Sequence, residues 1–194
     1  MVVGVTAPPP QVQPWADEVR RARRGDSDAF ATLVRALQRP VYGLCVRLLR
    51  ADAEAAEVAQ ETFLRAYQHL PTYDEARPFD LWVMTIARNL CLDLLRRRQK
   101  LGTDDVDDHA HHLASDEVSA EDAAIARQQR QSLEEALNTL PLDDREVLAL
   151  YYVQKRTTKD IAQVMGVAPG TIMARLFRAR EKLRRQMQPA EVTP

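Results

Sequence analysis

Residues 157–186, "TTKDIAQVMGVAPGTIMARLFRAREKLRRQ", decide the fold of the C-terminal part of the chain. They contain two short helical patterns on either side of "MGV". In the first pattern Ile161, Ala162 and Met165 share one inward face, and the small Ala162 suits a place where a second helix crosses closely. Gly166 follows, where a turn needs a residue that tolerates positive φ. The stretch therefore predicts a helix, a tight turn and a second helix.

The second helical pattern begins at Pro169, which fixes φ for a first helical turn. Ile172 and Leu176 form its inward face. The residues left pointing outward are Thr171, Met173, Ala174, Phe177 and Arg178, followed by Arg180, Lys182, Arg184 and Arg185. This pattern fits a helix that lies in the major groove of DNA. The alternative is a basic amphipathic hairpin that packs internally or binds a membrane or a protein.

Charge is segregated along the chain, although the net charge is only −1. Residues 154–188 contain nine basic and two acidic residues, a net charge of +7. Residues 104–122 contain eight acidic residues and no Lys or Arg. A near-neutral total thus conceals a basic segment suited to DNA and an acidic strip.

Composition predicts an all-α protein, because Gly is scarce and Ala, Leu, Arg, Glu and Gln are abundant. We expect two small helical bundles joined by an acidic flexible linker, the second ending in the helix-turn-helix. The expected ranges are a disordered tail over 1–16, the first bundle over 17–100, the linker over 101–121, the second bundle over 122–187 and a tail over 188–194.

Capping residues and prolines predict the helices of the first bundle. Asp26 or Ser27 caps a helix that Pro40 ends, and Pro40 opens another helix over 41–50. Asp52 caps the next helix, which ends at Pro71. Residues 79–100 carry the longest apolar stripe, and we place Trp82 of that stripe in the core.

Neither cysteine nor histidine indicates a cofactor or a catalytic centre. Cys45 and Cys91 lie in apolar helical patterns and are expected to be buried free thiols, with a redox switch as the alternative. His109, His111 and His112 accompany acidic residues in the linker, but nothing there imposes a ligand geometry, so we expect no metal site. The chain carries no signal peptide and no apolar run long enough to span a bilayer, which predicts a cytoplasmic protein that is not an enzyme.

Three motifs, in this order, resemble the extracytoplasmic-function (ECF, group 4) sigma factors of bacterial RNA polymerase. They are "DAEAAEVAQETFLRAY", "FDLWVMTIARNLCLDLLRRR" and "ALNTLPLDDREVLALYYVQ" with the closing "DIAQVMGVAPGTIMARLFRAREKLR". The resemblance implies that the first bundle is sigma domain two and the second is sigma domain four. It also implies that the protein binds core RNA polymerase and directs promoter-specific initiation by reading −35 and −10 elements.

The resemblance assigns three sets of residues. Those for the β′ coiled coil of the polymerase are Val58, Gln60, Glu61, Phe63, Leu64 and Arg65. Those for the −10 element are Arg88, Asn89, Asp93, Arg96 and Arg97, with Asn89 reading an extruded base beside the specificity loop "TYDEARPF". Those for the −35 element are Thr171, Met173, Ala174, Phe177 and Arg178, with Arg175, Arg180 and Lys182 as phosphate contacts.

Departures from the family pattern bear on promoter choice. Met173 stands where Arg or Lys is common, and Ala174 where Ser is common. Losing one bidentate base contact removes about 1–3 kcal/mol of discrimination at that step. Met84, Thr85, Asp80 and the run "TTKDIA" also differ from the usual residues.

The resemblance implies several partners: the polymerase β′ coiled coil and β flap, promoter DNA, and an anti-sigma factor, with no membrane insertion. The alternative function is a dimeric helix-turn-helix regulator that binds an operator. That class carries a receiver or ligand-binding domain upstream, and the first bundle lacks the alternating strands and helices of such a domain.

Overall fold

A computed structural model describes residues 14–102, 128 and 131–187, and every regular element among these residues is helical. The first bundle contains α1 (Ala16–Arg23), α2 (Ser27–Leu49), α3 (Asp52–His69), the 3₁₀ turn η1 (Leu70–Thr72) and α4 (Phe79–Leu101). The second contains a helix over 131–138, α6 (Leu142–Leu148), the π-helical turn η2 (Ala149–Val153), α7 (Thr158–Met165) and α8 (Pro169–Met187). The predicted all-α fold in two bundles is confirmed, while most of the predicted linker lies outside the described residues.

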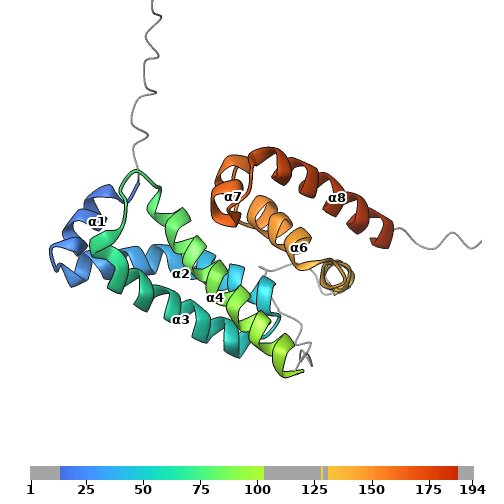
Figure 1. The fold of residues 1–194 in the computed structure, drawn as a ribbon, viewed down its shortest axis with the longest axis horizontal. Helices are drawn as coiled ribbons and strands as arrows, with labels where there is room; N and C mark the ends of the chain where they lie inside the picture. Colours follow the sequence, from blue (N-terminus) through green and yellow to red (C-terminus); the bar gives the residue numbers. More distant parts are fainter. Residues whose placement is uncertain (1–13, 103–127, 129–130, 188–194) are drawn as a thin grey trace, which may run out of the picture.

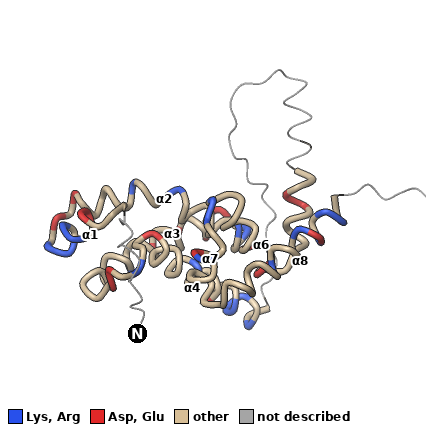
Figure 2. The backbone as a smooth tube through the Cα atoms, turned by 90° about the horizontal axis from the view of Figure 1, so that it is seen from above, with Lys and Arg blue, Asp and Glu red and all other residues tan. Residues whose placement is uncertain are grey.

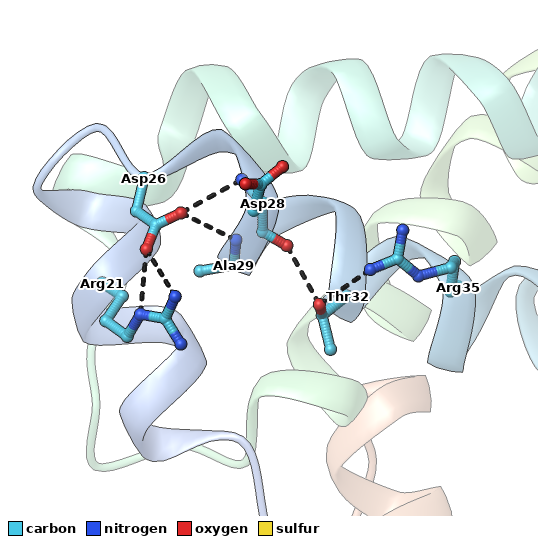
Figure 3. A network of polar contacts seen from close by, with 6 residues as sticks. All are labelled: Arg21, Asp26, Asp28, Ala29, Thr32 and Arg35. Atoms are coloured by element: carbon cyan, nitrogen blue, oxygen red, sulfur yellow. Dashed lines mark hydrogen bonds and ion pairs between the residues drawn. The ribbon is translucent and has the colours of Figure 1, made fainter.

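The start of α2 is stabilised by an N-terminal cap (Figure 3). Asp26 Oδ1 accepts hydrogen bonds from the backbone N–H groups of Asp28 at 3.1 Å and Ala29 at 3.0 Å. Arg21 Nε donates to Asp26 Oδ2 at 2.9 Å and so ties α1 to this cap. The hydrogen bond from Ala29, followed by that from Arg21, holds the pKa of Asp26 below its usual value. Asp26, one of the two residues predicted to cap this helix, is therefore the cap.

The predicted helix break at Pro40 is wrong, because α2 runs unbroken through it. A proline inside a helix costs about 3 kcal/mol, since it removes a hydrogen bond and crowds the preceding turn. Leu37, Val41 and Leu44 lie around it on the buried face of α2. Burying one such side chain contributes about 1.5–3 kcal/mol, so the packing of one continuous helix outweighs the local cost.

The predicted cap of α3 is displaced by one residue. Ala51 occupies the N-cap position without a side-chain hydrogen bond, and Asp52 is the first helical residue. Asp52 and Glu54 thus lie in the first turn, where the helix dipole favours negative charge.

The core of the first bundle forms where α2 packs against α1, α3 and α4. Cys45 of α2 and Cys91 of α4 are both fully buried in it as free thiols, which confirms that part of the prediction. Trp82 packs against this core, as expected, and its ring lies 4.8 Å from that of Tyr73 and 5.6 Å from that of Phe79.

The second bundle packs beside α4 (Figure 1). The contacts join α4 to α7 and α2 to α6. Within the second bundle α8 packs on α6 and α7. The outer face of α8 is consequently left without a protein neighbour among the described residues.

Candidate nucleic-acid and partner-binding surfaces

The closing motif adopts the helix-turn-helix predicted for it. Thr157 and Asp160 form a capping box at the start of α7, in which each side chain accepts a hydrogen bond from the other residue's backbone N–H. Gly166 ends α7 with φ of 68° and donates its N–H to the carbonyl of Ala162. Ala162 is only 5% exposed, which leaves little room for a larger side chain there.

The outward face of α8 carries large apolar side chains. Met173 is 64% exposed and Phe177 is 67% exposed, although Met and Phe side chains are usually buried in a folded protein. Ala174 and Arg178 are also exposed, whereas Thr171 is half-buried. These five residues are the predicted −35 readers, and four of them form an accessible surface.

The cations of α8 are held in place by carboxylates of α6. Arg175 Nη1 lies 2.9 Å from Asp143 Oδ2, and Lys182 Nζ lies 2.6 Å from Asp144 Oδ2. Figure 2 shows basic and acidic positions close together along α6 and α8. The second bundle therefore orients two of the three predicted phosphate contacts by ion pairs within the protein.

The third predicted phosphate contact, Arg180, lies over aromatic rings of η2. Its guanidinium carbon is 5.2 Å from the centre of the Tyr151 ring and 5.3 Å from that of Tyr152. Such cation–π contacts stabilise by about 0.5–1 kcal/mol at exposed sites, so Arg180 is positioned but not sequestered.

The C-terminal half of α4 displays most of the predicted −10 residues. Asn89, Asp93, Arg96 and Arg97 are exposed. Arg96 Nη1 donates to Asp93 Oδ1 at 2.9 Å, a solvent-exposed pair that contributes little to stability. These four side chains can reach a ligand without any rearrangement of α4.

Arg88 differs from the other −10 residues because it contacts the second bundle. Its Nε donates to Glu146 Oε1 of α6 at 2.6 Å. The Arg88 side chain is 14% exposed and that of Glu146 is fully buried. Burial raises the pKa of Glu146, and the charge and hydrogen bond of Arg88 offset only part of that effect. The sequence offered no signal for this pairing, because the two residues are 58 positions apart.

Two further polar contacts join the bundles. Arg156, between η2 and α7, forms an ion pair with Asp80 in the first turn of α4. Gln154 Nε2 donates to the carbonyl of Pro40 at 3.0 Å. Together with the Arg88–Glu146 pair they are polar links in a contact that also contains buried apolar side chains.

An apolar groove of about 730 Å³ lies between α2 and α3. This volume is typical of sites that receive a ligand or a partner side chain. Leu64 and Tyr67 on its α3 side are 52% and 51% exposed. The full lining consists of Phe30, Val34, Gln38, Arg39, Tyr42, Ala56, Ala59, Gln60, Phe63, Leu64 and Tyr67.

The predicted polymerase-binding residues of α3 divide into two groups. Gln60, Phe63 and Leu64 line the groove, whereas Val58 packs against the core. Glu61 and Arg65 form an ion pair at 2.7 Å one helical turn apart.

Side chains that were not predicted from the sequence complete this groove. Phe30 and Tyr67 contact edge-to-face, with ring centres 4.9 Å apart. Tyr67 follows Leu64 by three positions on α3, so helical periodicity could have identified it. The contribution of α2 depends on tertiary packing.

A smaller, more polar hollow of about 330 Å³ lies at the predicted specificity loop. Its lining includes Tyr73, Asp74 and Arg77 of the loop and Trp82 of α4. Burial, followed by the charges of Glu75, Asp80 and Asp74, raises the pKa of Tyr73 to about 12, so its hydroxyl remains a donor to the Arg77 carbonyl. Asn89 is not part of this lining.

A second apolar groove, of about 370 Å³, involves both bundles. Leu133, Tyr152 and Leu183 supply much of its apolar surface, and Arg47 of α2 contributes one edge. Arg145 also lines it, and burial, followed by the charge of Arg50, lowers the pKa of Arg145 to about 10.

The structure indicates neither a metal site nor a membrane span in the part of the chain it describes. No group of three or more His, Cys, Asp or Glu side chains there could hold a metal ion. No helix there is long and apolar enough to cross a membrane. His109, His111 and His112 lie outside the described residues.

Comparisons with known proteins identify both bundles. Residues 33–101 match Sigma-70 region 2, and residues 130–183 match Sigma-70 region 4. The chain is 30% identical over 178 residues to the ECF RNA polymerase sigma factor SigW of Bacillus subtilis, covering 88% of this chain and 95% of SigW. It is 34% identical over 177 residues to the ECF RNA polymerase sigma factor SigL of Mycobacterium tuberculosis, covering 87% of this chain and 97% of SigL.

A solved structure has the same fold. The sigma factor RpoE of Bartonella quintana, in complex with the anti-sigma factor NepR, superimposes with a TM-score of 0.65 at 22% identity, covering 84% of this chain and 98% of RpoE. The helix-turn-helix, the two matched sigma regions and relatives that span nearly the whole chain lead to one conclusion: this protein belongs to the ECF sigma factors of RNA polymerase.

Proposed function

We propose that this sigma factor directs core RNA polymerase to promoters by reading the −35 element with α8 and the −10 element with α4. The polymerase performs the chemistry, and the sigma factor contributes no catalytic residue. We place the protein in the cytoplasm, where the polymerase and the promoters are.

The −35 element is read by the exposed face of α8. Met173, Ala174, Phe177 and Arg178 point away from the bundle, which suits contacts with base edges in the major groove. The ion pairs of Arg175 and Lys182 with α6 hold those cations near the groove, where phosphate contacts position the helix without specifying sequence. Met173 offers apolar contact, for example to a thymine methyl group, in place of a bidentate hydrogen bond.

The −10 element is read by α4 and the loop before it. Asn89 is exposed on α4, so its amide can hydrogen-bond to an extruded base. The hollow beside Trp82 is polar and has room for a planar ring, so we infer that it receives an unstacked base. Because Asn89 does not line that hollow, we assign the two features to different bases.

Core polymerase docks at both apolar grooves. We assign the groove between α2 and α3 to the β′ coiled coil, because an exposed Leu64 flanked by Gln60 and Tyr67 suits a helix packing on α3. We assign the groove at Tyr152 and Leu183 to the β flap. An anti-sigma factor that covers these surfaces would keep the protein from the polymerase, as the complex of RpoE with NepR suggests.

The groove between α2 and α3 is the observation that carries this proposal. A dimeric operator-binding regulator needs one DNA-reading helix and a dimer contact, but not an apolar groove on a second bundle with its own DNA-facing helix. If the groove were instead a dimer contact, the free protein would be a dimer at micromolar concentration.

The direct test is run-off transcription from a library of promoter fragments with bacterial core polymerase. We expect transcripts only when both proteins are present, and a gel shift with the sigma factor alone should be weak. Tight binding by a dimer of the protein alone, with no transcripts, would establish the operator-binding alternative.

The groove itself is tested with Leu64→Arg. Loss of an interface hot spot of about 2 kcal/mol weakens core binding by roughly 30-fold, while an exposed position leaves folding unchanged. Gln68→Arg is the matched control, because Gln68 is exposed on the same helix and does not line the groove. If the two variants bind core polymerase with equal affinity, the β′ coiled coil docks at another surface.

A further inference from the structure

The contact between the two bundles is incompatible with simultaneous promoter reading. The −35 and −10 elements are centred about 25 base pairs apart, which is ~85 Å at a rise of about 3.4 Å per base pair. The 23-residue helix α4 is only ~35 Å long at about 1.5 Å per residue. Because α4 contacts α7, the first helix of the helix-turn-helix, the two reading helices lie too close together to span that distance.

The same contact occupies a residue of the −10 surface. Arg88 lies next to Asn89 on α4. Its guanidinium Nε donates a hydrogen bond to Glu146 Oε1 of α6 at 2.6 Å. Glu146 is a carboxylate, and a carboxylate offers Arg the same bidentate acceptor chemistry as a phosphate. Because Glu146 is fully buried and Arg88 is only 14% exposed, Arg88 cannot contact DNA while this pair persists, unlike the more exposed cations of α8.

The Arg88–Glu146 pair can also be replaced by a contact between Arg88 and DNA, because its net stabilisation is small. Glu146 is fully buried, and its second oxygen, Oε2, has no hydrogen-bond partner among the described residues. Removing two charges from water costs free energy that their attraction need not recover when one oxygen stays unsatisfied. The Arg156–Asp80 pair and the bond from Gln154 to the Pro40 carbonyl lie at the less buried part of the contact.

We propose that Glu146 is an internal competitor for promoter DNA, which holds Arg88 in a closed form of the free sigma factor. Docking on core polymerase separates the bundles and releases Arg88 to the −10 strand. This inference rests on the proposed function, because it gives Arg88 the role of a −10 contact. It explains how the free protein avoids DNA by means of its own residues.

The test uses Glu146→Gln in the full-length protein, which removes the charge and keeps the size of the side chain. Glu135→Gln is the matched control, because it makes the same change of charge at an exposed position of the second bundle, where Glu135 accepts a hydrogen bond from Gln131 of its own helix. The first measurement is affinity for a fluorescent single-stranded −10 fragment, taken from a promoter found by run-off transcription. The second is the radius of gyration from small-angle X-ray scattering.

If the closed form holds nine-tenths of the free molecules, opening them raises apparent affinity for the strand by about tenfold. We therefore expect tighter binding and a larger radius for Glu146→Gln, and no change for Glu135→Gln. Arg156→Gln, which weakens a more exposed interbundle pair, should shift both quantities in the same direction and serves if Glu146→Gln fails to fold. Unchanged affinity and radius in a folded Glu146→Gln or Arg156→Gln protein would overturn the proposal. Absence of transcription with wild-type protein would instead count against the proposed function, and scattering would still decide whether the contact holds the bundles together.

Discussion

Replacing Ala162 by Leu should destabilise the second bundle and impair −35 reading. Ala162 lies in the middle of α7 and is 5% exposed, and its carbonyl accepts hydrogen bonds from the N–H groups of both Gly166 and Val167 in the turn. Leu adds an isopropyl group to a site that is already filled. The backbone around that site is tied to the turn, so making room should move α7 relative to the helices it contacts, which include α8.

The magnitude follows from the cost of overpacking a core, which is about 1–3 kcal/mol. In a domain of this size each kcal/mol lowers the unfolding midpoint by about 4–8 °C, so we expect a fall of at least about 4 °C. Displacement of α8 should also reduce transcription from promoters that depend on a −35 element. Promoters that need only the −10 element should be affected less.

The assay compares Ala162→Leu with Gln163→Leu in thermal unfolding and in run-off transcription. Gln163 is exposed on the same helix, so introducing Leu there should change stability by no more than about 0.5 kcal/mol. If both variants unfold at the same temperature and transcribe equally well, Ala162 does not lie in a tightly packed site, and its small size is not needed for the turn.

Three other predictions concern local features. Thr157→Ala removes the capping box shared with Asp160 and should cost about 1 kcal/mol in urea unfolding, whereas an unchanged midpoint would show that the cap is dispensable. The pKa of Tyr73 is raised to about 12 in the folded protein, so its contribution to stability is complete below the unfolded value near 10 and is lost as pH rises through 12. Between pH 9 and 12 the midpoint temperature of unfolding should therefore fall less steeply for Tyr73→Phe than for the wild-type protein. Equal slopes for the two proteins would contradict this. Cys45 and Cys91 are buried, and the hydrogen bond between their thiols, followed by burial, raises the pKa of Cys91, so neither should react with a thiol reagent until denaturant is added. Rapid labelling of the native protein would show that the first bundle opens readily.

Local sequence determined the helix-turn-helix and much of its orientation. Apolar spacing selected the inward residues Ile161, Ala162 and Ile172, and all three are buried. Gly166 marked the turn because a left-handed backbone favours glycine, and its φ is 68°. Once those faces were assigned, Phe177 had to point outward. These features depend on residues within one or two helical turns, which is why a single sequence reveals them.

Tertiary structure decided the features that depend on residues distant in the sequence. Pro40 lies inside a continuous helix because buried neighbours on both sides outweigh its local cost. Phe30 completes the groove of α3 from another helix. Arg88 looked like a free DNA contact in sequence, and it is paired with Glu146 because the second bundle packs on α4. A helical period specifies which way a side chain points, but only the packing of helices against one another specifies what it meets.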